Sequence, residues 1–131
     1  MPMSIEIQML VWSMVLGLVH LFAASTAVTH ERGLKWNASP RDAQGPPVRP
    51  LTGRLQRAQS NFMETFPFFA AAVLAVVLTQ RQDGTTALAV QLYFWARVVY
   101  LPLYAAGVPY VRSLVWVVSL IGIIKLIFVL L

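Results

Sequence analysis

The sequence predicts an all-α integral membrane protein built as a bundle of four transmembrane helices. Of its 131 residues, 58% are apolar and only 11% are charged, and the mean hydropathy of +0.68 is well above the range of soluble domains. Four long apolar stretches are present, and each approaches the roughly 20 residues that a helix needs to cross the hydrocarbon core. No stretch has the alternating pattern of a strand, so nothing competes with the helical interpretation.

The four expected spans form a single domain over residues 1–131. They cover about residues 5–29, 53–80, 86–106 and 112–131. The first apolar stretch exceeds the roughly 7–15 residues of a signal-peptide core and has no Lys or Arg before it, so we interpret it as a retained span. The loop of residues 30–52 is long for a compact bundle, which is typical of a functional or mobile segment. Thr52 is the expected N-cap of the second helix.

Charge and cysteine content narrow the function further. The net charge is +5, but the basic residues gather in and beside the first loop, so the positive-inside rule explains them and we expect no nucleic-acid partner. These residues are Arg32, Lys35, Arg41, Arg49, Arg54 and Arg57. The first and third loops should therefore face the cytoplasm, with both termini on the other side of a membrane that we expect to be a bacterial inner membrane. The chain has no cysteine, so any thiol chemistry would require a ligand that brings the thiol.

Polar residues form a stripe on the second helix. Arg57, Asn61 and Glu64 stand at i, i+4 and i+7, within an arc of about 60°, and Arg54 falls near the same face. A structural interpretation is an ion pair that locks helices together. A functional interpretation is a binding site, because charged residues inside a membrane helix usually face a cavity or the bundle interior. His20 lies in the first span, where we expect it to hydrogen-bond a neighbouring helix.

A second polar group lies on the third helix. Arg97, Tyr100 and Tyr104 share one face and should meet the first stripe near the cytoplasmic boundary. Arginines would clamp carboxylates, and a glutamate and an asparagine would hold an amine and amides, which matches glutathione. Arg112 and Tyr104 are the candidates to stabilise its thiolate. Arg112 is equally explained as a topology-setting charge and Tyr104 as an interfacial aromatic residue.

The stretch RAQSNFMETFP, residues 57–67, resembles the R-A-x-x-N-x-x-E-x-x-P signature of the MAPEG family, the membrane-associated proteins in eicosanoid and glutathione metabolism. The later pattern of Arg97, Tyr100 and Tyr104, followed by Arg112 and Ser113, is similar to the family's third-helix motif. The resemblance covers nearly the whole chain. It implies a homotrimer, of bacterial type, that binds glutathione between neighbouring subunits. The implied glutathione contacts are Arg57, Gln59, Asn61, Glu64, Arg97, Tyr100, Tyr104 and Ser113, and the implied catalytic residues are Arg112 and Tyr104.

The expected function is that of a membrane-embedded glutathione transferase or peroxidase acting on lipophilic electrophiles or lipid hydroperoxides. Two departures leave the second substrate open: Thr65 stands where some family members carry an aromatic residue, and the first loop is rich in proline and charge. A rival hypothesis is a small transporter in which Glu64 carries protons or a cationic drug. A further alternative is a non-catalytic family member that binds lipid or a protein partner.

Overall fold

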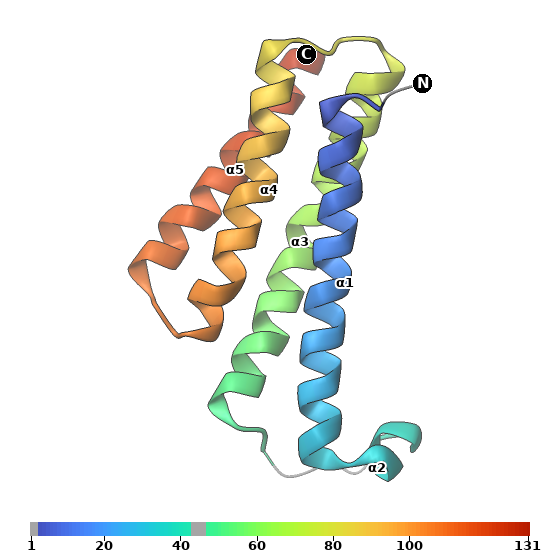
Figure 1. Ribbon diagram of the computed structural model, residues 1–131, viewed down its shortest axis with the longest axis vertical. Coiled ribbons are helices and arrows are strands. Elements are labelled where there is room, and N and C mark those ends of the chain that lie inside the picture. The colour runs from blue at the N-terminus through green and yellow to red at the C-terminus, as the bar shows by residue number, and fades with distance from the viewer. Residues whose placement is uncertain (1–2, 43–46) are drawn as a thin grey trace.

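A computed structural model describes residues 3–42 and 47–131, and the secondary structure of this part of the chain consists of helices and turns. The helices are α1 (Ile5–Arg32), α2 (Leu34–Ala38), α3 (Pro50–Leu78), α4 (Gly84–Ala105) and α5 (Tyr110–Leu130). All but α2 are long and apolar enough to cross a membrane. Figure 1 shows the four long helices running along one another, with both termini and the α3–α4 turn at one end, here called the terminal end. The first loop and the α4–α5 turn lie towards the opposite end, here called the loop end. The predicted all-α fold with four membrane-spanning helices is confirmed.

The helices fall within a few residues of the expected spans, except around the first loop. There α1 continues to Arg32, and α2 occupies part of the segment expected to be loop. The prediction that Thr52 caps the second helix is wrong, because Arg49 is the N-cap and Pro50 opens α3. A proline suits the first helical position, where its fixed φ is already helical and its missing N–H needs no partner. The Glu31 carboxylate accepts the Arg49 backbone N–H at 2.8 Å, which ties the start of α3 to the end of α1.

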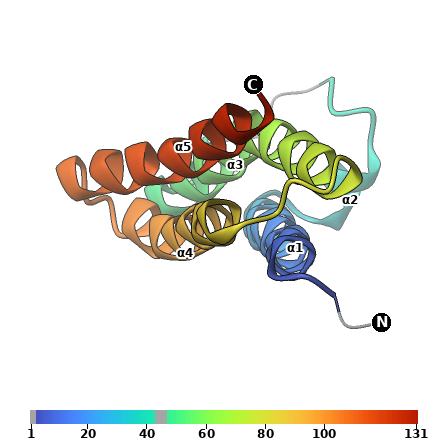
Figure 2. The same ribbon diagram turned by 90° about the horizontal axis from the view of Figure 1, so that it is seen from above.

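The bundle core lies where α1, α3 and α4 meet and where α4 packs along α5. Figure 2 shows α1 and α5 on opposite sides of the bundle, and within the described residues they do not contact each other. The rings of Phe69 and Tyr93 stack with centroids 3.9 Å apart, and both side chains are fully buried. The hydroxyl of Tyr93 lies 3.1 Å from that of Thr65. This contact gives the buried Tyr93 hydroxyl a partner, while the Thr65 hydroxyl also lies 3.2 Å from the Phe62 carbonyl oxygen.

The turn between α3 and α4 is fixed by side-chain caps. Asp83 and Thr86 form a capping box at the start of α4, in which each side chain accepts the other's backbone N–H. The Thr86 hydroxyl also donates to the buried Glu6 carboxylate of α1 at 2.8 Å. At the end of α3, Gln80 adopts a left-handed φ of 56°, and Arg81 N–H reaches back to the Val76 carbonyl. Hydrogen bonds therefore close the terminal end above the apolar core.

Helices α4 and α5 approach closely at Gly122. A Cβ added at this glycine would lie 2.6 Å from the Ala89 carbonyl oxygen and 3.1 Å from the Tyr93 backbone nitrogen. These are backbone atoms, so they cannot rotate out of the way. Small residues at helix contacts allow backbones in lipid to approach in this manner.

We therefore expect Gly122→Ala to push α4 and α5 apart and to destabilise the protein by about 1–3 kcal/mol, the usual cost of overpacking. Unfolding in detergent, followed by circular dichroism, measures this change. Gly84→Ala is the matched control, because Gly84 opens a helix with nothing within 4 Å of the added Cβ. Equal stability of the Gly122→Ala protein and the wild type would contradict the close-contact interpretation.

Candidate functional site

A small, mostly polar pocket of about 230 Å³ lies towards the loop end, between α3, α4 and α5. Its lining residues are Asn61, Tyr100, Tyr104, Arg112, Ser113 and Trp116. Five of these six were predicted as site residues from the sequence. Helix α3 contributes the amide, α4 the two phenols, and the first two turns of α5 the guanidinium, the hydroxyl and the indole.

Arg97 does not line this pocket but contacts two residues that do. Its side chain is fully buried, and Nη1 donates to Oδ1 of Asn61 at 2.9 Å. The guanidinium carbon lies 4.2 Å from the ring centre of Tyr100 and 5.5 Å from that of Phe62. A buried cation is costly unless it is paired, so this hydrogen bond and these ring faces must compensate for lost hydration. Arg97 thereby fixes the orientation of Asn61 and Tyr100, which do line the pocket.

The front of the pocket consists of aromatic and cationic groups in contact. The rings of Tyr100 and Tyr104 meet edge to face, with centroids 5.6 Å apart. The Arg112 guanidinium carbon lies 4.5 Å from the ring centre of Tyr104. The α4–α5 turn thus places side by side the two groups that were predicted to stabilise a thiolate. Ser113 lies next to them, with its hydroxyl donating to the Pro109 carbonyl at 3.3 Å.

Arg57 and Glu64 do not line the pocket. Both are exposed on the surface of α3, and Glu64 makes no hydrogen bond or ion pair within the described part of the chain. Arg57 and Glu64 stand one helical turn before and after Asn61. Asn61 faces α4, whereas Arg57 and Glu64 face outward. The two exposed charges are available to a ligand or to another copy of the chain.

Gln59 lies in a second polar hollow, of about 370 Å³, on the other side of α3. This hollow is lined by Leu21, Ala24, Ser25, Val28, Trp36, Asn37, Arg41, Gln56 and Gln59. The guanidinium carbons of Arg32 and Arg41 lie 4.6 and 5.2 Å from the ring centre of Trp36. Arg41 also donates to the Asn37 side chain and to its carbonyl. Trp36 and Asn37 of α2, together with Arg41, therefore form one wall of this hollow.

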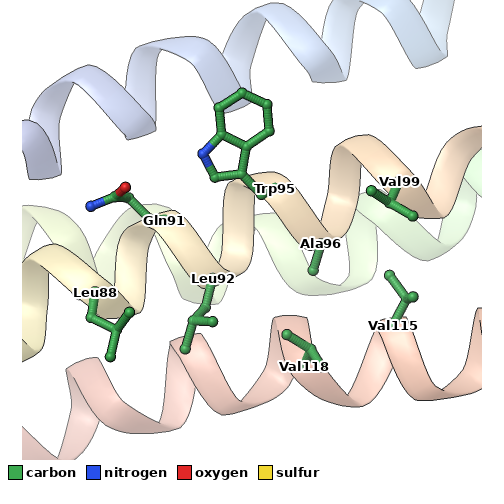
Figure 3. A pocket seen from close by; sticks show the side chains of 8 residues that line it. All are labelled: Leu88, Gln91, Leu92, Trp95, Ala96, Val99, Val115 and Val118. Atoms are coloured by element: carbon green, nitrogen blue, oxygen red, sulfur yellow. The ribbon is translucent and has the colours of Figure 1, made fainter.

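A third hollow, of about 360 Å³, runs between α4 and α5 and is apolar. Figure 3 shows that Leu88, Leu92 and Val118 border the space between the two helices, while Trp95 points away from α5. The one polar side chain is Gln91, whose amide donates to the Ala87 carbonyl of its own helix. The hollow offers no acid, base or nucleophile and is suited to contact with lipid.

His20 does not behave as predicted. Neither ring nitrogen has a hydrogen-bond partner among the described residues, so the expected bond to a neighbouring helix is wrong. The imidazole instead stacks on Phe62 at 4.9 Å between ring centres and is buried. The described residues contain no cluster of three side chains suited to hold a metal ion.

Trp116 is a pocket residue that the sequence interpretation missed. Its indole Nε1 is buried and has no acceptor among the described residues, although the side chain lines the pocket. Trp116 stands one helical turn after Arg112, a spacing that places both on one face of α5. That spacing is the signal by which it could have been found.

Comparison with known families gives one match, to the model of the MAPEG family, over residues 9–131. The match spans nearly the whole chain, including every residue of the pocket. Comparison with curated proteins gives no match to an individual sequence.

The Asn61–Arg97 bond gives a direct test of how the pocket is held. Asn61→Leu would leave a buried guanidinium without its hydrogen bond, and we expect a loss of about 2–4 kcal/mol in unfolding free energy. The double variant Asn61→Leu/Arg97→Met removes both partners and should recover part of that loss. Detergent unfolding of the single and double variants measures the coupling; additive effects would show that the bond contributes nothing.

Proposed function

The chain belongs to the MAPEG family, and we propose that it is a membrane-embedded glutathione-dependent transferase or peroxidase that acts on lipophilic electrophiles or lipid hydroperoxides. The family places it among membrane proteins of glutathione and eicosanoid metabolism. The observation that carries the finer proposal is the pair of Arg112 and Tyr104, in contact at the wall of a polar pocket. The chain has no cysteine, so a thiolate would have to come from a ligand. A cation and a phenol side by side would stabilise the negative charge of that thiolate.

In the proposed reaction, the glutathione sulfur sits against Arg112 and Tyr104. The cation and the phenol O–H favour the charged thiolate, which lowers the pKa of the thiol and supplies a nucleophile at neutral pH. In a transfer reaction, the sulfur forms a bond to the electrophilic carbon, and the leaving group departs with its electron pair. In peroxide reduction, the sulfur takes one oxygen and releases an alcohol, and a second glutathione then gives the disulfide and water.

The rest of the tripeptide must lie beyond the pocket. A volume of about 230 Å³ is below the roughly 300–1,000 Å³ of pockets that enclose small ligands. Arg57 and Glu64 are exposed on the adjoining surface of α3 and could bind a carboxylate and the amine of glutathione. Gln59, in the second hollow, faces a different side of the same helix. This division supports a homotrimer in which one copy offers the Arg112 pocket and its neighbour offers the Gln59 hollow.

Charge supports the proposed orientation. Arg32, Lys35, Arg41 and Arg49 all lie at or near the first loop, and Arg112 lies close to the α4–α5 turn. By the positive-inside rule we propose that the loop end, and with it the pocket, faces the cytoplasmic side of an inner membrane, where glutathione is found as the reduced thiol. Lipophilic substrates would reach the thiolate from the bilayer.

The pocket's composition does not favour the transporter hypothesis. A proton or cation carrier needs an acidic group at its site, whereas the pocket contains a guanidinium, two phenols, an amide, a hydroxyl and an indole but no carboxylate among the described residues. A non-catalytic family member would bind lipid or a protein partner and turn over no substrate, and the assays below distinguish it.

Titration of the detergent-solubilised protein with glutathione should produce the ultraviolet absorbance of a thiolate near neutral pH. Arg112→Ala should reduce the thiolate fraction about tenfold, which corresponds to one pKa unit. Lys125→Ala is the matched control, because it removes a charge from the same helix outside the pocket.

Absence of binding at millimolar glutathione would overturn the proposal. A chlorinated aromatic electrophile and a lipid hydroperoxide are then supplied in mixed micelles. Turnover of the first would identify a transferase, and turnover of the second would identify a peroxidase. Thiolate formation with no turnover of either compound would identify a non-catalytic member instead.

A further inference from the structure

Each of the last four carbonyls of α4 has a hydrogen-bond partner, and the last of these partners is a side chain from another helix. The carbonyls of Pro102, Leu103 and Tyr104 accept from the backbone N–H groups of residues 106, 108 and 107. This is a Schellman motif centred on Gly107, whose φ of 76° is the left-handed conformation that the motif requires. The remaining carbonyl, that of Ala105, accepts from Nη1 of Arg54 at 2.9 Å.

Arg54 also packs against the turn itself. A Cβ added to Gly107 would lie 3.4 Å from both Cζ and Nε of Arg54, so the guanidinium covers the bare glycine backbone. The positive group thus lies at the negative end of the α4 dipole. The bond from Arg54 to the Ala105 carbonyl is the only hydrogen bond between the described residues of α3 and residues 101–113. Figure 1 shows α3 between α1 and the α4–α5 pair towards this end, and Arg54 ties α3 to the α4–α5 turn.

The α4–α5 turn, which Arg54 contacts, connects Tyr104 and Arg112, the two residues proposed to stabilise the thiolate. Tyr104 is the second-last residue of α4 and Arg112 is the third residue of α5, on either side of the turn of residues 106–109. Their mutual position, 4.5 Å from guanidinium carbon to ring centre, therefore depends on the shape of that turn. Arg54 itself does not line the pocket.

We propose that Arg54 is a positioning residue, which sets the distance between Tyr104 and Arg112 by locking the α4–α5 turn to α3. The inference rests on the proposed function, since it concerns the pair that would stabilise the thiolate. Its role differs from that of Arg57, which is exposed on α3 and is available to bind glutathione directly.

The chain contains a matched control at the terminal end. Nη1 of Arg81 donates to the carbonyls of Val129 at 3.3 Å and Leu130 at 2.9 Å, so it caps α5 much as Arg54 caps α4. Arg81 lies far from the pocket, beside the α3–α4 turn. Removal of either arginine exposes helix-end carbonyls, but only removal of Arg54 should disturb the thiolate.

The experiment compares Arg54→Met, Arg54→Lys and Arg81→Met with the wild type, as full chains in lipid nanodiscs. Hydrogen exchange of the amides of residues 106–108 is measured without ligand, and the pH midpoint of thiolate formation is measured with glutathione. Arg54→Met should increase exchange at these amides about tenfold and raise the thiolate midpoint by about one pH unit. Arg54→Lys, which keeps one donor, should recover part of both changes, and Arg81→Met should leave both at the wild-type values.

Unchanged exchange in Arg54→Met overturns the inference whether or not glutathione binds. Increased exchange with an unchanged midpoint also overturns it, because Arg54 would then be a structural cap alone. If the wild type forms no thiolate, the proposed function fails, and the exchange comparison still decides whether Arg54 orders the turn. If Arg54→Met does not fold, Arg54→Lys is the test, because it keeps one donor but lacks the planar guanidinium that packs over Gly107. It should raise both the exchange and the midpoint, and wild-type values would overturn the inference.

Discussion

The structure depends on the constraint set by the high cost of a polar group in the hydrocarbon core that has no partner inside the protein. Arg97 shows the constraint most directly: its side chain is fully buried, Nη1 donates to Asn61 and two aromatic rings face the guanidinium, while Nε and Nη2 have no hydrogen-bond partner among the described residues. Lipid offers no water to take over these contacts. The side chains that solvate Arg97 are therefore fixed in position, and two of them, Asn61 and Tyr100, form the wall of the pocket. Stability and site geometry arise from the same contacts.

The same constraint shapes the two ends of the bundle. Helix ends leave unpaired carbonyls, and these need donors wherever water is scarce. Backbone N–H groups satisfy several of them through the tight turns at Gln80 and Gly107, and Arg54 of α3 and Arg81 of the α3–α4 turn donate to others. An arginine suits this task because it keeps its charge and reaches several acceptors at once. Arg54, one of the basic residues on which the topology prediction rests, thus also holds α3 to the α4–α5 turn.

The sequence predicted the four long apolar helices well because hydropathy and length determine them. Helical spacing identified Asn61, Tyr100 and Tyr104, whereas Arg112 was predicted from its position near the membrane boundary and Ser113 from the family resemblance. The predictions were less accurate where contacts with neighbouring helices determine the surroundings of a side chain. Arg57, Asn61 and Glu64 lie within about 60° of arc, but the edge of the contact with α4 passes between them, so only Asn61 lines the pocket. His20 lacks a polar partner because the side chain opposite it is Phe62, which no local pattern identifies. The prediction that Thr52 is the N-cap rests on the capping preference of its side chain alone, although Pro50 is the stronger signal of a helix start.

The exposed charges on α3 lead to an argument about assembly. With 29 residues, α3 is about 43 Å long, whereas the hydrocarbon core is roughly 30 Å thick, so part of the helix must project beyond it. If that part lies at the loop end, Arg57, about 10 Å from the start of α3, is near the boundary, while Glu64, about 21 Å from it, is already inside. A carboxylate on an outer surface at that depth would face lipid in a single copy, at a cost of several kcal/mol. Contact with a second copy and an amine-bearing ligand would remove that cost, so the placement of Glu64 favours an oligomer with the ligand between its subunits.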